Sequence, residues 1–293
     1  MIESLINKNP SNDSVSKLLK YYENGEFDLA LDLALLISKE YPSHLISWKV
    51  LGAIYRKKEN LEESLICNKK AVQIEPNDPD AHNNLSNCLR ALGRLEEAEV
   101  CIKKAVSLGS NVSNYYSNLG LVLIDLRKFV DAEVANRQAI KLNPGSFDAY
   151  FNLGITLQKL NRLDEAEKSY RYALELNSQS AETYCNLGVV LNDLCRFDEA
   201  EKVYKKSILL EPLYTNAYNN LGLTLALIGR LDDAESSYRK AIAIDKNNRE
   251  AISGLGDILV KKGKHKEGLD NLRRANGSIF FNIDNGLAVK SEA

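Results

Sequence analysis

The fold is decided by residues 147–180, which read FDAYFNLGITLQKLNRLDEAEKSYRYALELNSQS, because the chain returns to this pattern every 34 residues. The step Asn-Leu-Gly of residues 152–154 recurs at 186–188 and 220–222, and it extends back to 118–120. A fixed period of this length is typical of an array of stacked repeats. Phased from Ser11, eight repeats follow without insertion or deletion: 11–44, 45–78, 79–112, 113–146, 147–180, 181–214, 215–248 and 249–282. Residues 1–10 are then an N-terminal extension, and residues 283–293 are a C-terminal tail.

Each repeat, with its places counted from 1 to 34, is predicted to be a pair of helices. Tyr150, Leu153 and Leu157 recur at i, i+3 and i+7, which puts them on one face of a first helix. Small residues fill place 20 and allow two helices to approach closely. That column consists of Ala30, Ser64, Ala98, Ala132, Ala166, Ala200, Ala234 and Gly268. Proline stops the second helix in four repeats, at Pro42, Pro76, Pro144 and Pro212.

This pattern resembles the tetratricopeptide repeat in its length, its Leu-Gly step, its alanine columns, its terminal proline and its tyrosine column at Tyr170, Tyr204 and Tyr238. The resemblance covers nearly the whole chain. It implies an all-α fold, a right-handed superhelical solenoid of antiparallel helix pairs whose first helices line a concave groove. One helix pair cannot bury its apolar face alone, so stacking of neighbours is also expected on physical grounds. We therefore expect one elongated array instead of the two domains that 293 residues suggest.

The end of the array departs from the pattern. The eighth repeat carries His265, Gly268 and Asn276 at places that elsewhere hold apolar or helix-forming residues, so we expect a short, partly solvated second helix that serves as a cap. After it, Asn285-Gly286 lies between two apolar runs, a pattern typical of a β-hairpin. A frayed tail is the alternative, and a docking strand or the junction to a further domain is a third.

The composition argues against several classes of protein. The 38 Lys and Arg nearly balance the 40 Asp and Glu, which disfavours a nucleic-acid partner, and no run of 18 apolar residues suggests a membrane span. The first ten residues lack the pattern of a secretory signal, so a cytoplasmic location is expected. The odd number of five cysteines fits reduced thiols better than a disulfide framework.

No catalytic, cofactor or metal site is expected. His44, His82 and His265 fall at unrelated places of different repeats. The sequence has no glycine-rich phosphate loop and no Cys or His cluster with metal-ligand spacing. The chain is therefore predicted not to be an enzyme. The single tryptophan, Trp48, is expected in the core.

The charges of the second helices predict ion pairs within each helix. A glutamate at place 21 is followed four residues later by a basic residue, a spacing that brings the two side chains together. These pairs are Glu99 with Lys103, Glu133 with Arg137, Glu167 with Arg171, Glu201 with Lys205 and Glu235 with Arg239.

The candidate site is a row of asparagines at place 6 of five consecutive repeats: Asn84, Asn118, Asn152, Asn186 and Asn220. An amide offers a donor and an acceptor, so such a row can bond the backbone of an extended peptide. Leu121, Ile155, Val189 and Leu223 follow at i+3 and add an apolar stripe. Phe151 precedes one asparagine, and Asp148 contributes to an acidic edge. A structural role, in which each asparagine bonds the neighbouring helix, is the alternative.

The row is similar to the asparagine ladder in the repeats of protein O-linked N-acetylglucosamine transferases, which hold peptide substrates by their backbone, although no catalytic domain accompanies it here. Three hypotheses follow. The first is a non-enzymatic interaction scaffold that binds an extended segment of a protein or peptide partner in its groove. The second is the substrate-recruiting module of a glycosyltransferase-like or other modifying enzyme whose catalytic part is absent from this chain. The third is weak self-association through the second helices or the Phe280-Phe281 segment.

Overall fold

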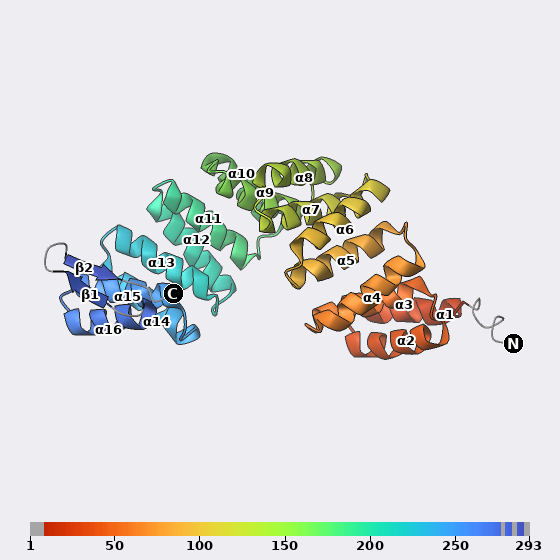
Figure 1. The fold of residues 1–293 in the computed structure, drawn as a ribbon. Helices are drawn as coiled ribbons and strands as arrows, with labels where there is room; N and C mark the ends of the chain where they lie inside the picture. The colour runs from red at the N-terminus through yellow and green to blue at the C-terminus, as the bar shows by residue number, and fades with distance from the viewer. Residues whose placement is uncertain (1–8, 277–278, 283–285, 290–293) are drawn as a thin grey trace. The chain divides into compact units, whose positions relative to one another are not determined.

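A computed structural model describes residues 9–276 and the backbone of 279–282 and 286–289. Within this part of the chain, helices follow one another in antiparallel pairs, one pair in each predicted repeat (Figure 1). The first helices are α1 (Asn12–Glu23), α3 (Leu45–Lys57), α5 (Pro79–Ala91), α7 (Ser113–Asp125), α9 (Phe147–Lys159), α11 (Ala181–Asp193), α13 (Thr215–Leu227) and α15 (Arg249–Lys261). The second helices are α2 (Phe27–Glu40), α4 (Leu61–Ile74), α6 (Leu95–Leu108), α8 (Phe129–Leu142), α10 (Leu163–Leu176), α12 (Phe197–Leu210), α14 (Leu231–Ile244) and α16 (His265–Asn276).

The turn between the two helices of a pair is the same in all eight repeats. The residue at place 15 has a positive φ each time, a backbone conformation that reverses the chain sharply. Four repeats use glycine here, and the others place Glu59, Arg127, Asn161 and Cys195 at φ values between 57° and 60°. Glycine adopts this conformation without strain, whereas the other four residues, all exposed, adopt it at an energetic cost.

The helices approach each other through the small residues that the sequence predicted. The place-20 column is buried throughout, with Ala166 and Ala200 completely inaccessible. At place 8, a Cβ on Gly188 would lie 2.5 Å from Cε1 of Tyr204, so the glycine leaves room for the tyrosine ring of the second helix. Trp48, expected in the core, is only half-buried at the edge of the cluster that includes Leu51, and its Nε1 donates to the Pro42 carbonyl at 2.9 Å.

The chain continues after α16 into a β-hairpin. Strands β1 (Ile279–Asn282) and β2 (Gly286–Val289) pair antiparallel, with Ile279 opposite Val289 and Asn282 opposite Gly286. The hairpin predicted from the turn sequence is thus confirmed for the backbone, and β1 comprises residues that the periodicity assigns to the eighth repeat. The turn residues 283–285 and the Phe280 and Phe281 side chains lie outside what the structure describes. Helix α16 has 12 residues against 14 in α14, as expected of a cap.

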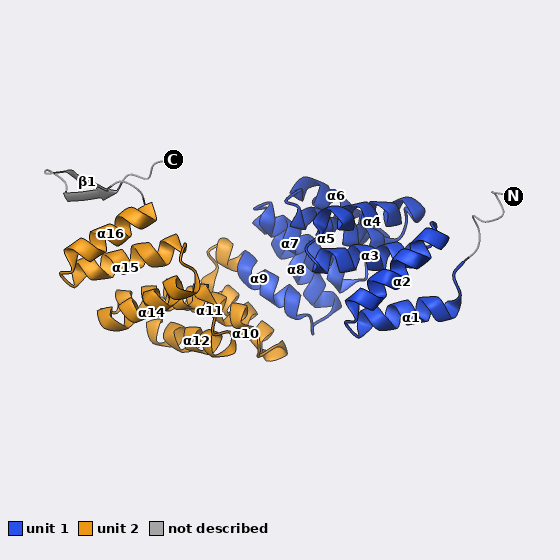
Figure 2. Ribbon diagram, turned by 90° about the horizontal axis from the view of Figure 1, so that it is seen from below, with its two compact units in different colours: residues 1–156 blue, residues 157–293 orange. Residues whose placement is uncertain are grey.

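The structure groups the chain into two compact units, unit 1 (residues 1–156) and unit 2 (residues 157–293), as Figure 2 shows. The boundary falls within α9, and the predicted 34-residue repeats continue on both sides of it. Each unit is therefore described by itself.

Candidate functional site

The predicted asparagine row lies on the first helices of both units. Asn84, Asn118 and Asn152 belong to unit 1, and Asn186 and Asn220 belong to unit 2. Asn152 is 4% exposed, whereas the other four are half-buried. We call the surface that carries these residues, in each unit, the first-helix face.

Three of the row asparagines bond the preceding repeat. The Asn118 Nδ2 donates to Asn83 Oδ1 at 2.7 Å, and the Asn152 Nδ2 lies 3.3 Å from both the carbonyl oxygen and the Oγ of Ser117. In unit 2, the Asn220 Nδ2 donates to the Cys185 Sγ at 3.5 Å.

Each acceptor residue is 35 positions earlier, immediately before the previous place 6, and each is buried. These bonds join adjacent first helices, as the structural alternative predicted. For Asn84 and Asn186, no side-chain hydrogen bond is found within the described residues, so these two amides remain available to a ligand.

The apolar stripe accompanies the row in both units. Leu121 and Ile155 in unit 1 and Val189 in unit 2 are half-buried, while Leu223 is 46% exposed. Phe151 is also half-buried and stacks on Phe147 with ring centroids 5.9 Å apart, and Asp148 is exposed. The side chains that sequence reasoning selected therefore lie on a partly accessible surface of mixed amide and apolar character.

A hollow of about 510 Å³ in unit 2 brings two predicted residues, Asn220 and Leu223, together with side chains that the sequence analysis missed. The additional lining comes from Asn219, Tyr238, Arg249, Glu250, Ser253, Gly254, Asp257 and Asn276. A signal for it was present in the sequence, because the eighth repeat has Gly254 in the asparagine column and Asp257 in the apolar column.

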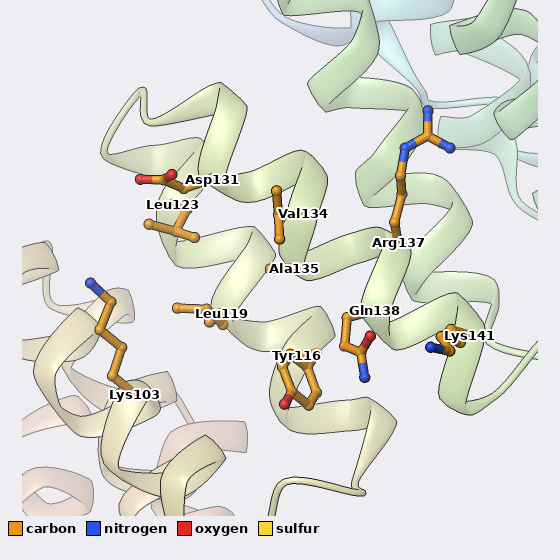
Figure 3. Close-up of a pocket in the computed structure, with 10 residues that line it drawn as sticks. All are labelled: Lys103, Tyr116, Leu119, Leu123, Asp131, Val134, Ala135, Arg137, Gln138 and Lys141. Carbon is orange, nitrogen blue, oxygen red and sulfur yellow. The ribbon is translucent and has the colours of Figure 1, made fainter.

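A second hollow, of about 690 Å³, lies in unit 1 between α6, α7 and α8 and holds none of the predicted site residues. Figure 3 shows Tyr116, Leu119 and Leu123 on α7 facing Val134 of α8. Lys103 and Arg137 also line this hollow, and they pair with glutamates of their own helices, each at 2.8 Å. This hollow therefore combines an apolar floor with a charged rim, on which Lys103 and Arg137 already have partners.

The ion pairs predicted within the second helices are all present, at N···O distances of 2.7 to 2.9 Å. A second set of ion pairs is not visible in the i,i+4 spacing: Glu99, Glu167, Glu201 and Glu235 also bind a cation from the following repeat. Arg196 binds Glu167, Arg230 binds Glu201 and Lys264 binds Glu235, at 2.6, 2.8 and 3.3 Å. Hydrogen bonds from Lys262 and other cations lower the pKa of Glu235 to about 2. These ion pairs therefore link the second helix of one repeat to the following repeat.

The cysteines and histidines are placed as ordinary packing and turn residues. Burial raises the pKa of the Cys67 thiol to about 12 and of the Cys185 thiol to about 11, which keeps both protonated and unreactive. Burial also lowers the pKa of His44, and His82 bonds the Pro76 carbonyl through Nε2 at 2.9 Å. In the described residues, no three His, Cys, Asp or Glu side chains gather as metal ligands would. None of the described helices has both the length and the apolar character needed to cross a membrane.

Comparisons with known proteins agree with the helix pairs. Family models described as the tetratricopeptide repeat match residues 47–78, 67–100, 147–180 and 179–247, which together make up more than half of the chain. A search of the curated proteins finds no match.

Several solved structures have a similar fold. The APC/C hetero-tetramer Cut9-Hcn1 matches with a TM-score of 0.74 and 20% identity over 83% of this chain and 48% of that one, so this chain spans about half of that neighbour's length. YrrB, described as a TPR protein with an unusual peptide-binding site, matches with a TM-score of 0.51 and 25% identity over 63% of this chain and 95% of that one. A tetratricopeptide repeat protein from Parabacteroides merdae gives a TM-score of 0.65 and 17% identity over 84% of this chain and 98% of that one.

Proposed function

Because this chain belongs to the tetratricopeptide repeat family, we propose that it is a non-enzymatic interaction scaffold that binds an extended segment of a partner protein on its first-helix face. Tetratricopeptide repeats generally mediate contacts between proteins. The neighbour YrrB, with 25% identity, is described as having a peptide-binding site. The choice of the first-helix face as the binding surface rests on this chain's own residues.

The observation that carries the proposal is a regular row of amides on the first helices, of which one half-buried member in each unit has no side-chain hydrogen bond within the described residues. Asn84 and Asn186 have no hydrogen bond to their side chains within the described residues. Asn118 uses one N–H for the preceding repeat and keeps its second N–H. An extended peptide needs such paired donors and acceptors for its backbone. The nearby Leu121, Ile155, Val189 and Leu223 would contact apolar side chains of the segment, with Phe151 and Asp148 beside Asn152.

The test uses the full chain, immobilised and panned against a phage-displayed library of random dodecapeptides. The informative variant is Asn84→Ala combined with Asn186→Ala, because neither side chain bonds the preceding repeat and the fold should be unaffected. The matched control combines Gln73→Ala with Gln179→Ala, two exposed amides that lie in α4 and in the turn after α10. Circular dichroism should show equal helix content in the wild type, the variant and the control.

We expect peptides to be enriched on the wild type and on the control, and to be lost or weakened at least tenfold on the Asn84 and Asn186 variant. If the wild type enriches no peptide, the scaffold function on this face is wrong. If the variant captures the same peptides with equal affinity, the asparagine row is purely structural.

A further inference from the structure

The hollow between α13 and α15 differs from the rest of the first-helix face in unit 2 because the eighth repeat interrupts both columns there. Gly254 takes the place of the asparagine, and Asp257 takes the place of the apolar residue. A Cβ on Gly254 would lie 2.6 Å from Cε1 and 2.8 Å from the hydroxyl oxygen of Tyr238. The missing side chain therefore lets the end of the Tyr238 ring reach the hollow.

Tyr238 brings a polar group without a partner to this hollow. Its two counterparts at place 24 use their hydroxyls: Tyr170 donates to Gln158 Oε1, and Tyr204 accepts from Asn192 Nδ2, both at 3.3 Å. Gln158 and Asn192 stand at place 12, where the seventh repeat has Ala226. Tyr238 is only 4% exposed, yet no hydrogen bond of its hydroxyl is found among the described residues. The residue is buried, but its hydroxyl borders the hollow, so a ligand there can supply the hydrogen bond that the protein does not.

The charged groups of the hollow are two carboxylates and one guanidinium, and besides the Tyr238 hydroxyl its other polar groups are amides and one serine hydroxyl. Asp257 and Glu250 contribute two carboxylates against one guanidinium from Arg249, and no ion pair joins these three in the part of the chain that the structure describes. Asn219 Nδ2 donates to Glu250 Oε2 at 3.2 Å, which fixes that carboxylate beside the row. Asp257 is exposed and forms no ion pair among the described residues, and partial desolvation raises the pKa of its carboxyl against the opposing charge of Lys261.

We propose that this hollow receives the cationic side chain of a Lys or Arg from the extended segment bound to the first-helix face. The aliphatic stem would pack on Leu223, and the head group would donate to Asp257 and Glu250 and to the Tyr238 oxygen. A long apolar stem with a charged donor at its end is the side chain that such a lining complements. The inference rests on the proposed function, since it specifies one position of the peptide that this function requires.

The experiment starts from the dodecapeptides that the full-length wild type selects. We expect one position to be enriched in Lys and Arg. The most enriched peptide is then synthesised with a fluorophore, together with a copy in which norleucine replaces that basic residue, and both are titrated by fluorescence anisotropy. The norleucine copy should bind at least tenfold more weakly to the wild type.

Two variants test whether the basic side chain of the peptide binds in this hollow. Asp257→Asn should weaken the basic peptide about tenfold and leave the norleucine peptide unchanged, and Tyr238→Phe should weaken it a few-fold. The control Asp164→Asn makes the same change of charge at an exposed residue of unit 2 and should have no effect. Because burial disfavours the charge of Asp257, the Asp257→Asn protein should melt no lower than the wild type, so lost binding cannot be attributed to unfolding.

The outcomes separate this inference from the function on which it rests. If peptides are selected without a preferred basic position, or if Asp257→Asn binds the basic peptide as the wild type does, the cation subsite is wrong and the scaffold function stands. If no peptide is selected, both are wrong.

Discussion

The two compact units fill the same position of the helix pair with different chemistry. At place 24, unit 1 has two amides, Asn68 and Asn136, beside Ala34 and Ile102, whereas unit 2 has three tyrosines, Tyr170, Tyr204 and Tyr238, beside Leu272. In both units this residue packs against the glycine of the first helix at place 8, as Gly120 does with Asn136 and Gly188 with Tyr204. The same backbone therefore accepts either an amide or an aromatic ring.

The difference lies in how well the polar groups are satisfied. Asn68 and Asn136 are 2% and 0% exposed, and their Oδ1 atoms have no hydrogen-bond partner in the described residues. Tyr170 and Tyr204 bury a whole ring and still bond a polar neighbour through the hydroxyl. Because an unpaired buried amide oxygen destabilises the fold and a buried ring stabilises it, we expect unit 2 to be the more stable unit. Trp48 lies in unit 1, so its fluorescence reports on that unit while far-UV circular dichroism reports on both.

The largest expected effect comes from truncating the ring. Tyr204→Ala should lower the free energy of unfolding by about 3 to 5 kcal/mol, since it leaves a cavity in the core of unit 2. Asn136→Ala, at the same place in unit 1, should change it by less than about 1 kcal/mol, because it also removes an unsatisfied oxygen. Urea denaturation followed by circular dichroism measures both. Equal losses would show that the buried amide and the buried ring contribute equally to the free energy of unfolding.

The next effect concerns the glycine beneath the ring. Gly188→Ala should cost about 1 to 3 kcal/mol, because the new methyl group would lie 2.5 Å from Cε1 of Tyr204. In a double-mutant cycle with Tyr204→Leu, part of this loss should be recovered, since the smaller side chain makes room for the methyl group. Strictly additive losses in urea denaturation would mean that the contact does not set the spacing of α11 and α12.

A gain of stability is expected where a buried amide oxygen of unit 1 lacks a hydrogen-bond partner. Asn136→Leu should raise the free energy of unfolding by about 1 kcal/mol, because it replaces a buried amide with an apolar side chain of similar size. The Trp48 fluorescence midpoint in urea should rise accordingly. Asn114→Leu, at an exposed position of α7, is the matched control and should leave the midpoint unchanged. A lower midpoint for Asn136→Leu would show that its bond to Thr156 outweighs the unsatisfied oxygen.

The hydroxyls of unit 2 allow a finer comparison. Tyr204→Phe should cost about 1 kcal/mol, because Asn192 loses a hydrogen-bond partner. Tyr238→Phe should have no measurable cost in the free protein, because its hydroxyl has no bond to lose. Thermal unfolding at neutral pH distinguishes the two. A similar drop in Tm for both variants would mean that the Tyr238 hydroxyl is satisfied without a ligand.

The sequence sufficed to predict the helix pairs, because the repeats share one spacing of small and apolar residues, and stacked helix pairs bury the apolar faces that this spacing creates. The ion pairs within α6, α8, α10, α12 and α14 followed from their i,i+4 spacing for the same local reason. The boundary between the two units inside α9 had no counterpart in the pattern, since the periodicity continues across it.

The sequence predicted the candidate site only as a column of asparagines at place 6, without their hydrogen-bond partners. Place 6 was visible in the sequence, but whether an amide bonds a neighbouring repeat depends on the side chain 35 residues earlier and on its burial, as with Asn118 and Asn83. The hollow beside Tyr238 was missed because it depends on three separate departures from the repeat: Ala226, Gly254 and Asp257. Each one alone looks like ordinary variation, and only the fold brings them together.

The smallest expected effect is a dependence on pH that differs between the units. Cations lower the pKa of Glu167, Glu201 and Glu235 in unit 2, whereas Glu99 is the corresponding case in unit 1. A carboxyl whose folded-state pKa lies below its ordinary value of 4.5 stabilises the fold above that pH, and this contribution is lost as the pH falls towards the folded-state value, about 2 for Glu235. The cations are half-exposed and screened by solvent, so each pair should contribute less than about 1 kcal/mol.

Between pH 5 and pH 3, the urea midpoint from circular dichroism should therefore fall further than the Trp48 midpoint. Glu182 and Asp257 act in the opposite direction, because burial raises their pKa values and their protonation stabilises the fold on acidification. They should reduce the fall in unit 2, and Asp257→Asn should make it steeper. Glu235→Gln should make the same fall shallower, since it removes a carboxyl whose pKa is lowered to about 2. If the two midpoints fall by equal amounts, the glutamates that join the repeats of unit 2 add no more stability than the carboxyls of lowered pKa in unit 1, which are Asp80, Glu97 and Glu99.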